Sequence, residues 1–133
     1  MELTIYTDGA SRNNPGESGA GVYILRDGEP FEQIARYLGT TTNNVAEYNG
    51  LLAALRWAVE HHVTTLHIRA DSELLVKQMT GQYRVKHPGL LQLYGEARQL
   101  SANIGRVTFE HVRREFNKEA DRLCNEAMDE AGA

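Results

Sequence analysis

The sequence predicts a single α/β domain built on a mixed β-sheet. Three observations support this fold class. The chain has 133 residues, 41% of them hydrophobic and 24% charged, which suits one globular domain with one core. Apolar residues alternate with period two in five short segments and follow helical spacing in four others. Residues 1–133 contain no internal repeat and no low-complexity linker, so we expect one domain.

The first three strands are predicted at residues 3–7, 19–28 and 30–39. The Asp27-Gly28 pair between the second and third strands is typical of a tight hairpin. These strands therefore form an antiparallel meander, in which the first and third run the same way. The first strand is expected to end at Asp8, and the glycines of residues 16–21 to let the chain turn back into the sheet.

A helix is predicted from about Val45, with Asn43 or Asn44 as its N-cap. The apolar residues at helical spacing are Tyr48, Leu52, Leu55 and Val59. After this helix we expect, in order, a strand, two helices, a strand and a final helix, over residues 64–70, 72–81, 90–102, 106–112 and 117–131.

Four acidic residues occupy comparable places in this plan. Asp8 and Asp71 each end a predicted strand, whereas Glu47 and Asp121 each lie in the first turn of a helix that follows a strand. Right-handed crossovers would make the fourth and fifth strands parallel to the first. All four acids then lie at the edge beyond the carboxyl ends of the parallel strands, where open α/β sheets bind their ligands.

Each acid also has a purely structural explanation. Glu47 and Asn44 match a capping box, Asp71 or Ser72 would serve as an N-cap, and the other two acids would complete a turn and complement a helix dipole. These explanations do not require a shared edge. Converging carboxylates raise one another's pKa unless cations neutralise them. Ligands that offer only oxygen suit Mg²⁺ or Mn²⁺, so the acids predict a divalent-metal site.

Four blocks carry a resemblance to a known family: "YTDGASRNNPGESGAG" (6–21), "TTNNVAEYNGLLAAL" (41–55), "RADSELLVKQ" (69–78) and "HVRREFNKEADRLCNEA" (111–127). With these blocks the chain resembles type 1 ribonuclease H, the endonuclease family that hydrolyses the RNA strand of RNA–DNA hybrids. The resemblance implies the ribonuclease H-like fold, a five-stranded mixed sheet of order 3-2-1-4-5 flanked by helices. It also implies products with 5′-phosphate and 3′-hydroxyl ends.

The resemblance implies that two ions, Mg²⁺ or Mn²⁺, are held by the four acids: Asp8, Glu47, Asp71 and Asp121. Asp8 would bridge both ions. Glu47 and Asp71 would hold the ion on the side of the leaving group, and Asp121 the ion that carries the attacking water. Glu47 would also contact the 2′-hydroxyl of the substrate.

The resemblance further implies contacts between the hybrid and Asn14, Thr42, Asn43 and Asn44, which match the family's N-P-G and T-N-N sequences. An A-form-like duplex presents 2′-hydroxyls and phosphates in a wide, shallow minor groove. Side-chain amides both donate and accept hydrogen bonds, so they can recognise a 2′-hydroxyl without adding charge. The alternative for Asn43 and Asn44 is helix capping alone.

The chain departs from longer bacterial relatives at two places. They carry a basic protrusion after the third acid, whereas here the linker "QYRVKHPG" (82–89) retains only Arg84, Lys86 and His87. Weaker hybrid binding is expected. Those relatives also place a His in a loop before the last acid to assist product release. Arg114 is the preferred counterpart here and His111, in a predicted strand, is the alternative.

Charge, cysteine content and hydropathy indicate which partners and which cellular location to expect. The net charge of −4 argues against binding nucleic acid mainly through a basic surface, although a bound metal would supply local positive charge. A single cysteine fits a reducing cytoplasm, and no segment is long and apolar enough to span a membrane. We expect a cytoplasmic monomer whose partner is an RNA–DNA hybrid, with double-stranded RNA as a further possible substrate.

Three other classes of protein fit the predicted fold less well. A proofreading exonuclease would carry D-x-E in its first acidic motif, but Gly9 and Ala10 follow Asp8. A resolvase or transposase domain would lack the T-T-N-N and N-P-G blocks. A non-catalytic hybrid-binding module would be expected to have lost at least one of the four acids, and all four are present.

Overall fold

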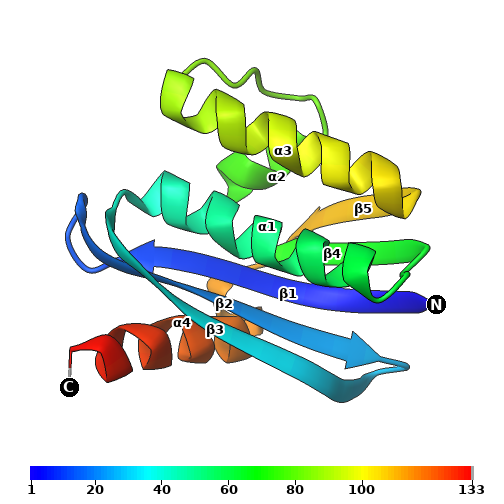
Figure 1. Cartoon of the computed structure of the whole chain (residues 1–133), viewed down its shortest axis with the longest axis horizontal. Helices are drawn as coiled ribbons and strands as arrows, with labels where there is room; N and C mark the ends of the chain where they lie inside the picture. The colour runs from blue at the N-terminus through cyan, green and yellow to red at the C-terminus, as the bar shows by residue number, and fades with distance from the viewer. Residues whose placement is uncertain (133) are drawn as a thin grey trace.

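The structure, a computed structural model, describes residues 1–132 as a five-stranded sheet with helices on both faces (Figure 1). The elements are β1 (Glu2–Ser11), β2 (Gly16–Arg26), β3 (Glu29–Thr41), α1 (Asn43–Glu60), β4 (Thr65–Ala70), α2 (Glu73–Met79), α3 (Pro88–Ile104), β5 (Arg106–His111), the 3₁₀ turn η1 (Arg114–Phe116) and α4 (Lys118–Ala131).

The sheet has the order β3-β2-β1-β4-β5. β1 pairs antiparallel with β2, and β2 with β3, so the predicted meander is confirmed. β1 and β4 are parallel, as are β4 and β5. The hairpin between β2 and β3 turns at Asp27 and Gly28, whose φ angles of 52° and 80° are those of a type I′ turn. The predicted strand order of 3-2-1-4-5 is therefore confirmed.

The two faces of the sheet are covered differently. α1 packs on β1 and β2, and α3 packs on α1, so the main core lies on this face. α4 packs on the opposite face, against β2 and β3 (Figure 1). Leu51, Leu52 and Leu55 of α1 are fully buried against strand residues such as Ile5 and Ile68. Among residues 1–132, no helix is long and apolar enough to cross a membrane.

β1 does not end at Asp8, as the sequence predicts, but continues to Ser11. The reason is that its two neighbours stop at different points. Pairing with β4 ends at Thr7, opposite Ala70, whereas pairing with β2 continues through Asp8 to Ser11. Asp8 therefore still lies just beyond the parallel part of the sheet, although it is inside a strand.

Two glycines allow the helices to approach the sheet closely. A Cβ atom on Gly9 would lie 2.1 Å from the carbonyl oxygen of Ala46 in α1. A Cβ atom on Gly21 would lie 2.1 Å from the carbonyl oxygen of Ala120 in α4. Gly21 is thus a strand residue whose lack of a side chain lets α4 pack closely on the sheet. The prediction that Gly21 lets the chain turn is wrong. The two contacts bring the first turns of α1 and α4 close to Asp8, one on each face.

Candidate active site

The predicted acids converge at the edge of the sheet where β1 and β4 separate. Asp8, Glu47 and Asp71 each offer a carboxylate oxygen, and these oxygens lie within 4.8 Å of one another. Asp121 lies outside this triplet but is close enough for protonated Asp8 to donate a hydrogen bond to its carboxylate. The expectation that four acids share one edge therefore agrees with the geometry.

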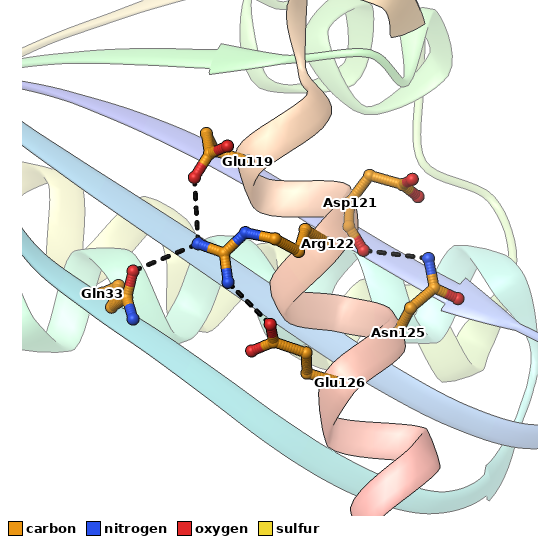
Figure 2. Close-up of polar contacts among 6 residues, drawn as sticks. All are labelled: Gln33, Glu119, Asp121, Arg122, Asn125 and Glu126. Atoms are coloured by element: carbon orange, nitrogen blue, oxygen red, sulfur yellow. Dashed lines mark hydrogen bonds and ion pairs between the residues drawn. The ribbon is translucent and has the colours of Figure 1, made fainter.

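Each acid is brought there by a different element. Asp8 follows the last β1 residue paired with β4, and Asp71 directly follows the last residue of β4. Asp121 lies in the first turn of α4, as predicted. Glu47 is the fifth residue of α1, because this helix begins at Asn43 and not at Val45, so the prediction that Glu47 lies in the first turn is wrong. Figure 2 shows that the side chains of Asp121 and Arg122 project from different sides of α4. Arg122 donates hydrogen bonds to Glu119, Glu126 and Gln33.

Burial and mutual repulsion keep these carboxyl groups from ionising fully. Asp8 is only 8% exposed. Burial, followed by the charges of Asp71, Glu47 and Asp121, raises the pKa of Asp8 to about 8. Burial likewise raises the pKa of Glu47 to about 7, although a hydrogen bond from Ser72 opposes the rise. The pKa of Asp71 is also raised by burial, against the opposing effects of Arg114 and Asn117.

The donor set fits a small, hard divalent cation. The three clustered groups offer oxygen only, which Mg²⁺ and Mn²⁺ prefer over nitrogen or sulfur ligands. Burial, together with the neighbouring carboxylates, raises the pKa values of Asp8 and Glu47 and so disfavours their charged forms. A cation at this place would release the protons and relieve the repulsion.

Arg114 is the cation that the structure places beside the acids. Its Nε lies 3.8 Å from Oδ2 of Asp71, while 89% of its side chain is exposed. Its charge lowers the pKa values of Asp71 and Glu47. His111 instead is the exposed last residue of β5, and the acid it influences is Glu73. The preferred counterpart, Arg114, is thus beside the cluster, and its role in turnover stays a prediction.

The predicted substrate residues form a hydrogen-bonded corner between the first loop and α1. The backbone N–H of Asn43 donates to Oδ1 of Asn14 at 3.1 Å. The backbone N–H of Ser11 donates to Oδ1 of Asn43 at 2.7 Å. Thr42, not Asn43 or Asn44, is the N-cap of α1, because its hydroxyl accepts from the backbone N–H of Val45. The side-chain oxygen of Asn43 is thus used to hold the loop.

A pocket of about 360 Å³ lies beside this corner, between the N-terminal ends of α1 and α3. The residues that line it are Asn14, Thr42, Asn44, Val45, His87 and Leu90. His87 is the N-cap of α3, and its Nδ1 accepts from the backbone N–H of Gly89. Helix N-termini carry partial positive charge and favour anions, so the two helix ends at this pocket suit a phosphate group, although Val45 and Leu90 make part of its lining apolar.

Known proteins resemble this chain over almost its whole length. A family model described as "Reverse transcriptase-like" matches residues 6–127. The Ribonuclease HI of Halobacterium salinarum is 39% identical over 127 residues, which cover 95% of this chain and 64% of that protein. LC11-RNase H1, solved in complex with an RNA/DNA hybrid, is 39% identical, with a TM-score of 0.95 over 98% of this chain and 99% of that one. The chain belongs to the type 1 ribonuclease H family.

A third relative shows that ribonuclease H sequences of this kind also occur in longer proteins. The bifunctional protein Rv2228c of Mycobacterium tuberculosis is 44% identical over 133 residues, which cover 98% of this chain and 36% of that protein. The chain thus spans about a third of the length of that relative and 64% of the Halobacterium protein.

Two residues of this ribonuclease H site have positions whose role the sequence does not predict. The sequence predicts Ser72 only as a helix cap, and it is the N-cap of α2, but its hydroxyl also lies near Glu47 and lowers the pKa of that carboxyl group. The sequence predicts Asn117 only as the first residue of the last helix. Its buried side chain donates to the carbonyl oxygen of Thr7 at 2.9 Å. An asparagine at the start of a helix is typical of an N-cap, so local sequence does not indicate a long-range contact of this kind.

Proposed function

We propose that the protein is an endoribonuclease that hydrolyses the RNA strand of RNA–DNA hybrids and leaves 5′-phosphate and 3′-hydroxyl ends. The observation that carries the proposal is the cluster of Asp8, Glu47 and Asp71, whose oxygens lie within 4.8 Å of one another in a chain of the ribonuclease H family. The complex of LC11-RNase H1 with an RNA/DNA hybrid supports the choice of substrate.

Four carboxylates would hold two divalent cations, Mg²⁺ or Mn²⁺. Asp8 lies between the two helices that bring Glu47 and Asp121, so it is suited to bridge both ions. Glu47 and Asp71 would hold one ion and Asp121 the other. Cations held by these residues would supply an activated water and stabilisation of the leaving 3′-oxygen.

The remaining residues of the site bind and orient the hybrid. Glu47 would also accept a hydrogen bond from a 2′-hydroxyl, which DNA lacks. Asn14 and Asn44 border the pocket between α1 and α3, where a backbone phosphate would meet two helix N-termini. Asn43 would contribute by holding the first loop, and Thr42 by capping α1 beside the pocket.

The direct test is to incubate the protein with labelled RNA–DNA hybrid, double-stranded RNA and double-stranded DNA, each with Mg²⁺ or Mn²⁺. We expect cleavage of the RNA strand of the hybrid, and Asp8→Asn should abolish it while the fold and hybrid affinity are kept. Asp27→Asn makes the same chemical change in an exposed turn with a φ of 52°, which asparagine accepts readily, so this control should cleave normally.

Three results would contradict parts of the proposal. Unchanged cleavage by Asp8→Asn would refute the assignment of Asp8 to the metal site. Binding of hybrid without cleavage of any substrate would favour a non-catalytic binding module. Cleavage of double-stranded RNA at the rate of the hybrid would show that the substrate range extends beyond hybrids.

A further inference from the structure

Asn117 is a buried polar residue that links three of the four acids. It is 1% exposed and precedes α4 directly. Its position is that of the helix N-cap, yet its side chain makes no capping hydrogen bond. The side chain points to β1 instead, where Nδ2 donates to the carbonyl oxygen of Thr7 at 2.9 Å. Asn117 thus forgoes a favourable N-cap hydrogen bond, and its side chain is held by the hydrogen bond to Thr7 instead.

The contact with Thr7 falls where the sheet opens. Thr7 is the last β1 residue paired with β4, and it lies opposite Ala70. Asp8 and Asp71 are the residues that directly follow Thr7 and Ala70 in the sequence. The amide of Asn117 thus supplies a hydrogen bond at the end of the ladder. It fixes the backbone of β1 directly before Asp8.

Asn117 also reaches the other two acids. Its amide lies near enough to the carboxylate of Asp71 to lower the pKa of that group. Its backbone carbonyl accepts from the N–H of Asp121 at 3.1 Å, in the first turn of α4. Among residues 1–132, Oδ1 of Asn117 has no hydrogen-bond partner although it is buried. An unpaired buried acceptor costs free energy. The amide nevertheless keeps this orientation, so the contacts of its N–H groups must offset that cost.

We propose that Asn117 is a positioning residue that sets the spacing of Asp8, Asp71 and Asp121, and thereby the affinity of the site for divalent cations. Partners that orient metal-binding carboxylates typically contribute 10- to 100-fold to metal affinity. This inference rests on the proposed function, because it takes the acids to be the metal ligands. It predicts a defect in metal binding that is present without any nucleic acid.

The test compares Asn117→Ala with Asn125→Ala. Asn125 lies on α4 and, like Asn117, donates a side-chain hydrogen bond to a backbone carbonyl, that of Asp121 at 3.0 Å (Figure 2). Its bond stays within the helix, whereas that of Asn117 reaches β1. Calorimetric titration of the folded proteins with Mn²⁺, without nucleic acid, should show affinity reduced at least about tenfold in Asn117→Ala. Asn125→Ala should remain within about twofold of the original protein.

Hybrid cleavage provides the second measurement. Asn117→Ala should lower kcat at a fixed low Mn²⁺ concentration, leave KM for the hybrid unchanged, and recover at high Mn²⁺. A purely structural role would lower the melting temperature without changing metal affinity in the folded protein, and that result would overturn the inference. If Asn117→Ala does not fold, Asn117→Ser, which keeps a donor, takes its place in the same comparison.

The two proposals fail in different ways. If the original protein cleaves no hybrid, the proposed function is wrong, and the Mn²⁺ titration still decides the role of Asn117. If it cleaves hybrid and Asn117→Ala binds Mn²⁺ with unchanged affinity, the positioning role is wrong and the proposed function stands.

Discussion

Replacing Gly21 with alanine tests whether close packing of α4 on the sheet positions the site. The new Cβ atom would lie 2.1 Å from the carbonyl oxygen of Ala120, 2.8 Å from the backbone nitrogen of Cys124 and 3.0 Å from Cβ of Leu123. Ordinary contacts begin at 3.4 Å, so α4 would have to withdraw by about 1.3 Å. Two of these three atoms belong to the backbone of the helix, and a change of rotamer cannot move them.

The cost follows from the rigidity of the packing. Overpacking of this kind destabilises by about 1–3 kcal/mol, and we expect the upper end because the clash is with backbone. For a chain of 133 residues this corresponds to a fall of roughly 10 °C in melting temperature. Asp121 lies next to Ala120 and would move with the helix. A displacement of about 1 Å typically costs about a hundredfold in rate, so hybrid cleavage should fall by that order.

The assay is urea unfolding together with hybrid cleavage, and Gly95→Ala is the matched control. Gly95 lies inside α3, where an added Cβ atom has no neighbour within 4 Å. Alanine is favoured over glycine in a helix by about 1 kcal/mol, so this variant should be slightly more stable and equally active. The packing argument is refuted if the free energy of unfolding of Gly21→Ala lies within about 1 kcal/mol of that of the original protein and the variant cleaves hybrid at the same rate.

Two further predictions concern charge. Without metal, the free energy of unfolding should decrease as the pH rises from about 4 to about 8, because folded Asp8 and Glu47, with pKa values of about 8 and about 7, retain protons that the unfolded chain releases. Urea titrations at pH 5 and pH 8 should show this decrease, and saturating Mg²⁺ or Asp8→Asn should reduce it; a stability that rises over this range would contradict the reasoning. Arg114→Ala should shift the pH for half-maximal cleavage upward, because the guanidinium lowers the pKa values of Asp71 and Glu47. Arg113→Ala removes a neighbouring cation whose ion-pair partner is Glu115, and an equal shift in both variants would exclude a specific role for Arg114.

The strand order and the edge shared by the acids could be predicted because both depend on repeated local patterns. A tight Asp27-Gly28 turn, alternating apolar residues and right-handed crossovers suffice to order the strands. The end of β1 could not be predicted from the same patterns. It depends on β2 continuing to pair after β4 has turned away, and a strand's own sequence carries no record of which neighbour ends first.

The N-cap of α1 illustrates a second limit. Thr42, Asn43 and Asn44 are all good caps by composition. Thr42 takes this role while Asn43 binds the backbone N–H of Ser11, 32 positions earlier in the chain. Local propensity ranks such neighbours almost equally, so a tertiary hydrogen bond decides among them. Asn117 is the same case at α4, where the contact with Thr7 replaces a cap.

The glycine after Asp8 has a different purpose from the one its sequence suggests. Asp-Gly at a strand end is typical of a turn, but Gly9 is a buried strand residue against which the backbone of α1 rests at Ala46, next to Glu47. Gly21, directly opposite Asp8 in the ladder, admits α4 on the other face, next to Asp121. Each helix carries its acid one residue beyond its point of closest approach. Asp8 is therefore flanked by two positions without side chains, and this pairing allows carboxylates from both faces of the sheet to meet at one strand residue.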